Sequence, residues 1–321
     1  MADAYTTTGS ISTDQAMWDR AMYYSLRPEY YFDRFADVKS TNAAPDSGSS
    51  VKFTITTDLA VASTPLNESV DVDAVALSDS QVTLTLAEYG NAVVTTFRAR
   101  ATSFIPLDRT AANAVGENAG VSMDTVARDV LAAGTNVRYA TGGTTDPTAR
   151  NTVEPGDTLT AHDVRRARVD LAAASVGRFN GFYAAVIHPD VAFDLRTETG
   201  AAAWRDPHVY SQPAEIWNGE VGAFEGFRFI ESPRAPVFAD AGSSTTLTDV
   251  YRTLFFGRQA LAKAYSTFEG RGAMPTTVFG AVTDKLRRFQ PIGWHWYGAY
   301  GIFRQAAVRA VESSSSIGGN S

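Results

Sequence analysis

The sequence contains no cysteine and only four lysines, Lys39, Lys52, Lys263 and Lys285. Without cysteine it can form no disulfide, thiolate nucleophile, iron–sulfur cluster or cysteine-ligated zinc site. It has no run of 18 apolar residues, so it predicts no membrane span. Its polar first residues lack the basic-then-apolar order of a secretion signal. The formal net charge of −7 argues against an ordinary basic nucleic-acid-binding domain.

Motifs for catalysis or metal binding are also missing. The sequence has no GxSxG elbow, no GxxxxGK[ST] loop and no HExxH spacing. No pair of carboxylates is marked out by apolar surroundings. The four histidines are better explained as helix-start and turn residues than as ligands, and they are His162, His188, His208 and His295. The sequence therefore predicts no enzyme activity, no cofactor and no metal.

Aromatic residues are scarce in one long stretch of the chain. The protein has 321 residues, of which 44% are hydrophobic and 20% charged, which predicts a folded chain of two domains, or of one large domain with insertions. Residues 36–178 hold only five aromatics, whereas residues 18–35 hold seven and residues 289–303 hold six. Because aromatic side chains dominate core burial, we expect the two aromatic-rich ends to be held in a hydrophobic core and the middle stretch to be thin, with little core of its own.

A long two-stranded ribbon is predicted within this thin middle. Apolar residues alternate with polar ones at Val51, Phe53 and Ile55, and again at Val82, Leu84 and Leu86, with residues 93–97 extending the return side. A polar, acidic tip lies between the two arms. Twenty extended residues span roughly 65 Å. A compact globule formed by all 321 residues would have a radius of gyration of about 20 Å. The ribbon must therefore leave its own globule.

A lone ribbon of two strands is marginally stable in water and needs another surface over its apolar face. With so few aromatics nearby, we expect that surface to belong to another subunit, so that the projection over residues 51–97 finds no cover within its own chain. The alternative is a pair of edge strands of an ordinary sheet, joined by a loop.

The remaining elements form a mixed helix and strand pattern. A helix is predicted from Asp108 to about Ala133, with Gly134 as its stop. Another short helix follows the caps at residues 12–14. Residues 41–50 have the composition of a linker, and residues 313–321 that of a disordered tail. From residue 158 onward the pattern predicts helices at 161–174 and after His188, and strands at 181–187, 224–230, 253–256 and 293–308.

Two groups of residues could serve binding or packing. Arg165, Arg166 and Arg168, like Arg287 and Arg288, could touch phosphate, although such groups more often form a solvated face or ion pairs between subunits. Trp294, Trp296 and Tyr297 fit a core better than a binding platform.

The order of these elements resembles that of the major capsid proteins of tailed bacteriophages, in particular those of podovirus-like and actinobacterial phages. The stretches that carry the resemblance are TPLNE at 64–68, QVTLTLAEYGNAVVTTF at 81–97, MDTVARDVLAAG at 123–134, IHP at 187–189 and the closing segment at 284–312. The sequence departs from the family pattern at Lys285, where proline commonly stands, and at Ser69, where glycine is usual.

The resemblance implies an α+β chain with the Johnson fold, divided into five parts. These are an N-terminal arm (1–47), an extended loop (48–98), a peripheral domain with a spine helix (99–157), an axial domain (158–283), and a closing strand that returns to the peripheral domain and ends in a disordered tail (284–321).

The function that the resemblance implies is that of an icosahedral shell protein, found in the virion, assembled as hexamers and pentamers in the host bacterial cytoplasm and enclosing double-stranded DNA. Scaffolding, cement or decoration, and portal proteins are the further partners expected, together with non-specific contact with DNA. The candidates for facing either the DNA or a neighbouring subunit are Arg165, Arg166 and Arg168. Lys52 lies near the ribbon's base, so no lysine–asparagine crosslink is expected. The subunit-interface residues expected in the ribbon are Val51, Phe53, Ile55, Pro65, Leu66, Glu68, Val82 and Leu84.

Two other functions stay open from the sequence. One is an encapsulin-like nanocompartment shell protein with the same fold, which would enclose enzymes rather than DNA. The other is a soluble enzyme or carbohydrate-binding module, which would be a small monomer or dimer with a pocket that perturbs titrating groups.

Overall fold

A computed structural model describes most of the chain. The described ranges are 32–41, 49–56, 75–103, 107–143, 146–198, 220–243, 245–267, 272–279, 284–286 and 288–317, with single residues between 59 and 71. The helix expected after residues 12–14, and residues 42–48 of the expected linker, lie outside these ranges. Within them, no helix has the length and hydropathy that a bilayer crossing requires.

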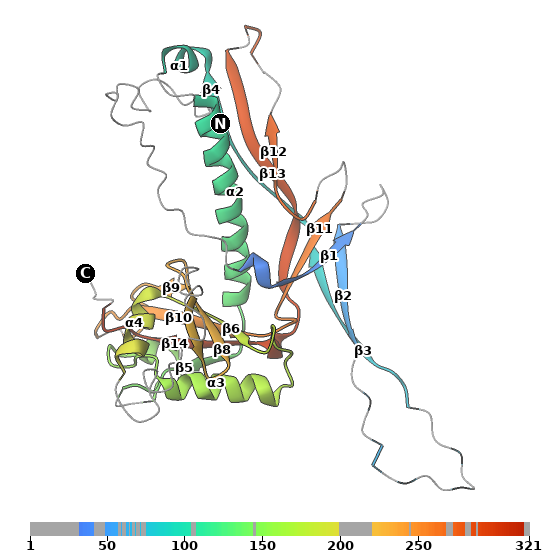
Figure 1. The fold of residues 1–321 in the computed structure, drawn as a ribbon, viewed down its shortest axis with the longest axis vertical. Helices are drawn as coiled ribbons and strands as arrows, with labels where there is room; N and C mark the ends of the chain where they lie inside the picture. The colour runs from blue at the N-terminus through green and yellow to red at the C-terminus, as the bar shows by residue number, and fades with distance from the viewer. Residues whose placement is uncertain are drawn as a thin grey trace.

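The longest helix, α2 (Leu107–Ala132), confirms the predicted spine helix. Its buried side chains recur every four residues, so that one stripe of the helix faces the core. This stripe packs on strands β13 and β4, and α2 stands upright beside them in Figure 1. The buried residues of the stripe are Val115, Ala119, Met123, Ala127 and Leu131.

A five-stranded sheet lies against α2. Its central strand is β13 (Phe289–Ile302). One edge of β13 pairs over ten residues with β4 (Ala87–Thr96), and the other edge pairs with β11 (Leu261–Ser266) and β12 (Thr276–Phe279). Beyond β11 lies β1 (Ala36–Thr41), in parallel, preceded by the short helix η1 (Asp33–Phe35). The prediction that residues 93–97 extend the ribbon is therefore wrong, because β4 belongs to this sheet and Phe97 begins α1 (Phe97–Thr102).

A second sheet has seven strands, and we call it the axial sheet after the domain that the resemblance predicts. Its order is β5–β14–β10–β6–β8–β7, with β9 also paired to β10. Helix α3 (Ala161–Ala173) lies along β14, and Thr160 caps α3 as predicted, reciprocally with Asp163. The remaining elements are β5 (Val137–Tyr139), η2 (Arg150–Thr152), β6 (Tyr183–Ile187), α4 (Pro189–Thr197), β7 (Glu220–Phe224), β8 (Phe227–Glu231), β9 (Val237–Phe238), β10 (Val250–Phe256), η5 (Gln305–Ala307) and β14 (Val308–Ser313).

The two sheets are joined by two short connections that cross between them. Strand β10 of the axial sheet continues through residues 257–260 into β11 of the other sheet, and β13 continues through residues 303–307 into β14. The pairing thus divides the chain differently from the expected ranges: β11 and β12 come from the range assigned to the axial domain, and β5 from the range assigned to the peripheral domain. The five-part division itself stays a prediction.

The serine-rich end of the chain is ordered up to residue 317, contrary to the disordered tail expected for 313–321. Ser314 donates from its backbone N–H to the carbonyl oxygen of Asp157 (2.9 Å) and from Oγ to that of Pro155 (3.0 Å). Ser316 donates its backbone N–H to Asp194 Oδ2 (2.9 Å). Residues 313–315 are buried because they continue β14 across the axial sheet. Low-complexity composition was misleading here, while residues 318–321 lie outside the described part.

Candidate assembly interface

The ribbon begins as a separate two-stranded sheet. Strands β2 (Ser50–Thr56) and β3 (Asp79–Thr85) are antiparallel, and the two elements lead away from the body in Figure 1. In this register Val51 lies opposite Leu84, and Phe53 lies opposite Val82. Because alternate side chains share a face of a strand, these four apolar residues gather on one face.

That face is covered at its base by the same chain. Val51, Phe53, Leu84 and Leu86 are all buried, in a cluster with Ala262, Ala264 and Ala299 of the five-stranded sheet. The ring of Phe53 packs edge-on against Phe303, with 5.4 Å between the ring centroids. The expectation that the projection over residues 51–97 has no cover within its own chain is therefore wrong for its base, because small residues on β11 and β13 leave room for it.

One glycine makes this close approach possible. A Cβ added to Gly301 would lie 2.1 Å from Cδ2 of Leu84. Lys39 then closes the edge of the cluster, since its Nζ lies 5.3 Å from the centroid of the Phe53 ring and donates to the carbonyl oxygen of Lys52 (2.8 Å). The base of the ribbon is thus part of the folded body.

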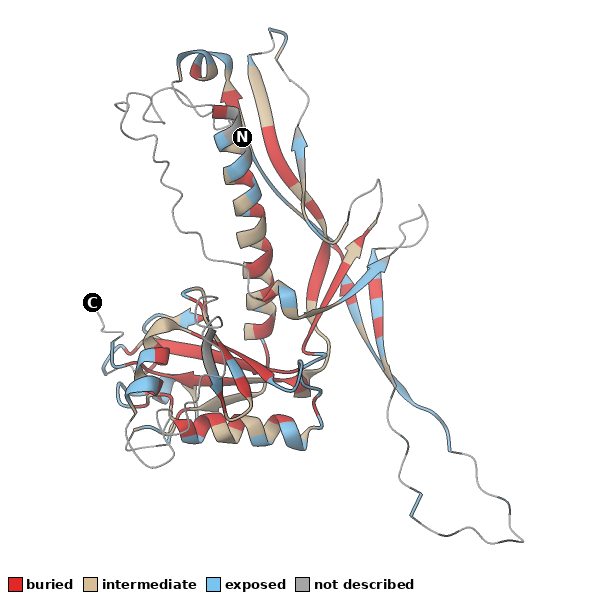
Figure 2. Cartoon of the chain, in the orientation of Figure 1, coloured by how far each residue is buried: buried red, intermediate tan, exposed pale blue. Residues whose placement is uncertain are grey.

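The distal ribbon is exposed instead. Leu59, Val75 and Leu77 are 56%, 69% and 68% exposed, and Figure 2 shows blue where the described part of this projection is exposed. Pro65 and Glu68 are also exposed, Ile55 and Val82 are half-buried, and Leu66 lies outside the described residues. The seven described residues of the predicted interface therefore grade from buried at the base to exposed toward the tip. Their assignment to a subunit interface stays a prediction.

The arginines singled out in the sequence are paired within the chain. Arg165 and Arg168 both reach Glu225, at 2.9 and 3.1 Å, and Arg166 lies 3.9 Å from Asp163. Arg288 pairs with Asp284 at 2.6 Å, which lowers the pKa of that carboxyl, and Arg287 lies outside the described residues. Each of these arginine side chains stays partly exposed and can still contact phosphate. The neighbouring carboxylate neutralises part of its positive charge, so its attraction to phosphate is weaker.

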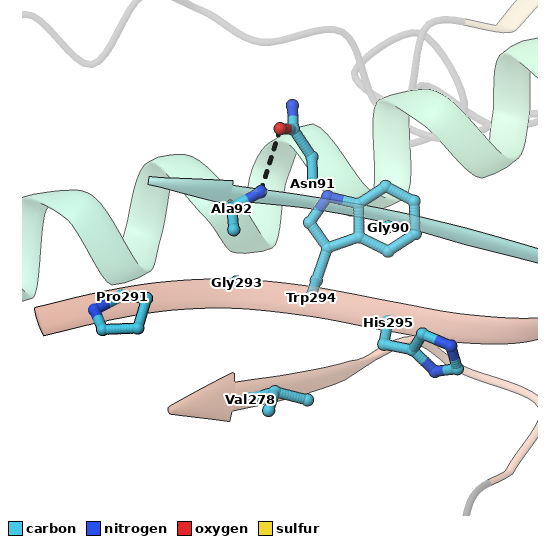
Figure 3. Close-up of a pocket in the computed structure, with 8 residues that line it drawn as sticks. All are labelled: Gly90, Asn91, Ala92, Val278, Pro291, Gly293, Trp294 and His295. Carbon is cyan, nitrogen blue, oxygen red and sulfur yellow. Dashed lines mark hydrogen bonds between the residues drawn. The ribbon is translucent and has the colours of Figure 1, made fainter. Parts of the chain in front are cut away.

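A shallow hollow of about 540 Å³ lies over strands β4, β13 and β12, as Figure 3 shows. Its polar side chains already have partners in the chain. Trp294 Nε1 donates to Asn118 Oδ1 (3.0 Å), and Asn91 Oδ1 accepts from the backbone N–H of Ala92 (2.9 Å). His295 Nε2 lies 3.8 Å from a carboxylate oxygen of Glu88. The hollow brings together no nucleophile with a general base, and Trp294 is buried against α2, as a core residue would be.

His188 is a helix cap. Its Nδ1 accepts a hydrogen bond from the backbone N–H of Asp190 (3.3 Å) at the start of α4, and burial lowers the pKa of the imidazole. Tyr251 donates to Asp190 Oδ2 (2.9 Å), and burial raises the pKa of this phenol. His162 is exposed at the start of α3, while His208 lies outside the described residues. Within the described ranges, no three potential ligands are grouped as a metal site would require.

Several buried charged residues were missed in the sequence. Glu312, fully buried, pairs with Arg252 and with Arg150 (2.7 Å). Asp124 and Lys263 are 1% and 2% exposed. For Asp124 a signal existed, because it follows Met123 beside the apolar stripe of α2. For Glu312 and Lys263 none did, because their burial depends on long-range strand pairing.

Comparison with known proteins gives one family and one fold. The family model described as phage capsid protein matches residues 36–312, which is most of the chain. A comparison with curated proteins gives no match.

Three solved capsid structures illustrate the similarity of fold. The capsid of Ralstonia phage GP4 is similar over 100% of both chains, with a TM-score of 0.76 and 17% identity. The capsid of cyanophage P-SCSP1u covers 97% of this chain and 96% of its own, with a TM-score of 0.69 and 15% identity. The capsid of cyanophage Pam1 covers 99% and 100%, with a TM-score of 0.64 and 16% identity. At such identities the likeness concerns the fold.

Proposed function

Because the chain belongs to the phage capsid protein family, we propose that its copies associate as hexamers and pentamers, with the distal ribbon as a contact between copies. The protein is a structural major capsid protein with the Johnson fold and is not an enzyme. It self-associates in a shell and is part of the virion. The family match favours this function over that of an encapsulin-like compartment.

The observation that supports the ribbon as an intersubunit contact is its division into two parts. The base packs inside its own fold, so it holds the projection in a fixed direction. The distal part presents apolar side chains to water, with Leu59, Val75 and Leu77 all more than half exposed. When a partner subunit covers apolar residues on a projecting segment, burial of their surface stabilises the association of the two subunits. Many such modest contacts, repeated by symmetry, stabilise a closed shell.

Further partners belong to the same proposal. The net charge of −7 suits a wall beside packaged double-stranded DNA, because strong binding would oppose packaging and release. Arg165, Arg166 and Arg168 have nearby carboxylates, so a contact of these residues with phosphate would be weak and non-specific. Scaffolding, decoration and portal proteins complete the proposed set, with assembly in the cytoplasm of the host bacterium.

Deletion of part of the ribbon tests the intersubunit contact. Residues 59–78 would be replaced by a short glycine-rich turn, which leaves the pairing of Thr56 with Asp79 intact. The base cluster then stays covered, so we expect the shortened chain to fold with an unchanged circular dichroism spectrum. Without the distal contacts it should form no shells, measured by sedimentation and electron microscopy.

A matched control separates the loss of contacts from the loss of length. Leu59, Val75 and Leu77 would be changed together to serine in the full-length ribbon, which preserves its reach but removes its apolar side chains. We expect this variant also to fold and to assemble poorly. Shells of normal size and yield from the deletion variant would contradict the proposed role of the ribbon.

A further inference from the structure

The buried carboxylate of Asp124, in the middle of α2, is shared between two parts of the chain that are far apart in sequence. Its Oδ1 accepts hydrogen bonds from the backbone N–H groups of Phe32 (2.7 Å) and Asp33 (3.4 Å). Its Oδ2 pairs with Nη2 of Arg234 (3.1 Å), which lies in the loop between β8 and β9 of the axial sheet. One side chain therefore contacts the N-terminal segment with one oxygen and the axial sheet with the other.

The N-terminal segment, residues 32–41, has a second charged anchor. Asp33 Oδ1 accepts from Nζ of Lys263 (2.7 Å) and from the hydroxyl of Tyr300, both on the five-stranded sheet. Phe32 is fully buried beside these contacts. The segment then continues as β1 at the edge of that sheet.

The loop of Arg234 is anchored just as firmly on its own side. Arg234 Nη2 also donates to the carbonyl oxygen of Val121 (3.0 Å), and Arg128 Nη1 of α2 donates back to the carbonyl oxygen of Arg234 (3.1 Å). The contact between Arg234 and Asp124 lies eight residues before the end of α2, which corresponds to about 12 Å along the helix axis. It therefore braces the axial sheet against α2 well away from the point where Ala132 leads into the sheet.

We propose that Asp124 is a latch that couples docking of residues 32–41 to seating of the Arg234 loop on α2. The coupling follows from the shared carboxylate. The N-terminal segment and Arg234 bind its two oxygens, so each of them holds the carboxylate in the orientation in which it accepts from the other. If residues 32–33 undock, Oδ1 loses these two backbone donors, and the carboxylate can turn away from the orientation in which Oδ2 accepts from Arg234. If Arg234 withdraws, the buried carboxylate loses its guanidinium partner, which destabilises the charge on which the N-terminal segment docks.

Undocking would change the partners of two buried charges. Asp124 would keep Arg234, whereas Lys263 would lose the carboxylate of Asp33 and keep the rings of Trp296 and Tyr300, whose centroids lie 5.6 and 5.5 Å from its Nζ. The latch thus connects the N-terminal segment, α2 and the axial sheet as one conformational unit. Any neighbour that pulls on the N-terminal segment would loosen the brace of the axial sheet.

Hydrogen exchange of the full-length chain, with every variant held in the same assembly state, tests the coupling. Arg234→Met changes a side chain whose hydrogen bonds in the described part of the chain go to α2, yet we expect exchange of amides in 32–41 to become at least tenfold faster. Reciprocally, Asp33→Asn should speed exchange at residues 232–235 by a similar factor. Asp124→Asn should affect both segments, since asparagine has one oxygen in place of two, and its NH2 group must then face either the backbone N–H groups or the guanidinium, which are all donors.

Ser122→Ala is the matched control. Ser122 lies on the same helix, two residues from Asp124, and its hydroxyl donates to the carbonyl oxygen of Asn118 within α2 (2.7 Å), so both segments should exchange as in the unchanged protein. If Arg234→Met fails to fold, Arg234→Lys keeps the charge but loses the planar fork and gives the same readout in weaker form. The latch is wrong if each variant changes exchange only in its own segment, with less than a twofold effect on the other. Because the readout needs no shell, failure here is distinct from failure of the ribbon contact.

Discussion

Substitution of Phe53 by alanine measures how firmly the ribbon is joined to its own subunit. The ring is only 6% exposed and packs edge-on against Phe303, with the cation of Lys39 beside it. Removal of a buried phenylalanine ring costs about 3–5 kcal/mol in a closed core. The cluster at the base is small, so we expect a value near the lower limit, about 3 kcal/mol. This loss should appear in the free energy of unfolding of a single chain, before any assembly.

The assay is equilibrium unfolding of the unassembled chain in urea, followed by tryptophan fluorescence and circular dichroism. Leu77→Ala is the control, since Leu77 is also on the ribbon but is 68% exposed. It should change the unfolding free energy by less than about 0.5 kcal/mol, as exposed positions do, while it weakens assembly. If Phe53→Ala left the unfolding free energy unchanged, the ribbon's base would not be part of the folded body in solution, and the buried cluster would not be what directs the projection.

Three further outcomes are expected. Trp294→Ala should lower the unfolding free energy by about 3–5 kcal/mol, because the indole is buried against α2 and bonded to Asn118; a near-silent substitution would contradict its role in the core. Burial lowers the pKa of His188, so the unfolded chain binds the proton more readily, and stability should fall as the pH falls from the ordinary histidine pKa of 6.5 toward the lower folded value. In His188→Asn, which can still cap α4, urea titrations should show this part of the pH dependence gone; an unchanged slope would refute it. Denaturing gels of purified particles should show single chains only, because Lys52 lies at the ribbon's base; a ladder of covalent multimers would refute this.

Local patterns predicted the individual elements well. The apolar spacing along α2, the cap at Thr160 and the buried strand before His188 are confirmed because each depends on residues within one turn or one strand. The family was also indicated by short stretches in their correct order, and the match over residues 36–312 confirms it.

Long-range pairing could not be predicted in the same way. The periodicity of residues 81–97 is that of continuous strand, but a change of partner at Leu86 splits it between the ribbon and the five-stranded sheet. The cover over the ribbon's base comes from three alanines, at 262, 264 and 299, and from Gly301, all more than 170 residues farther along the chain, and their small size carries no local signal. The serines at 313–315 are buried because of their neighbours in the axial sheet, and their own composition indicates the opposite.

The place of β14 in the axial sheet has a consequence for biosynthesis. This strand lies between β5 and β10, in the interior of the sheet, although it follows both of them in the sequence. While the chain emerges from the ribosome, β5 and β10 are therefore made before the strand that pairs with both. Until β14 has been added, each of the two leaves one edge without its partner, so the order of synthesis delays completion of the axial sheet.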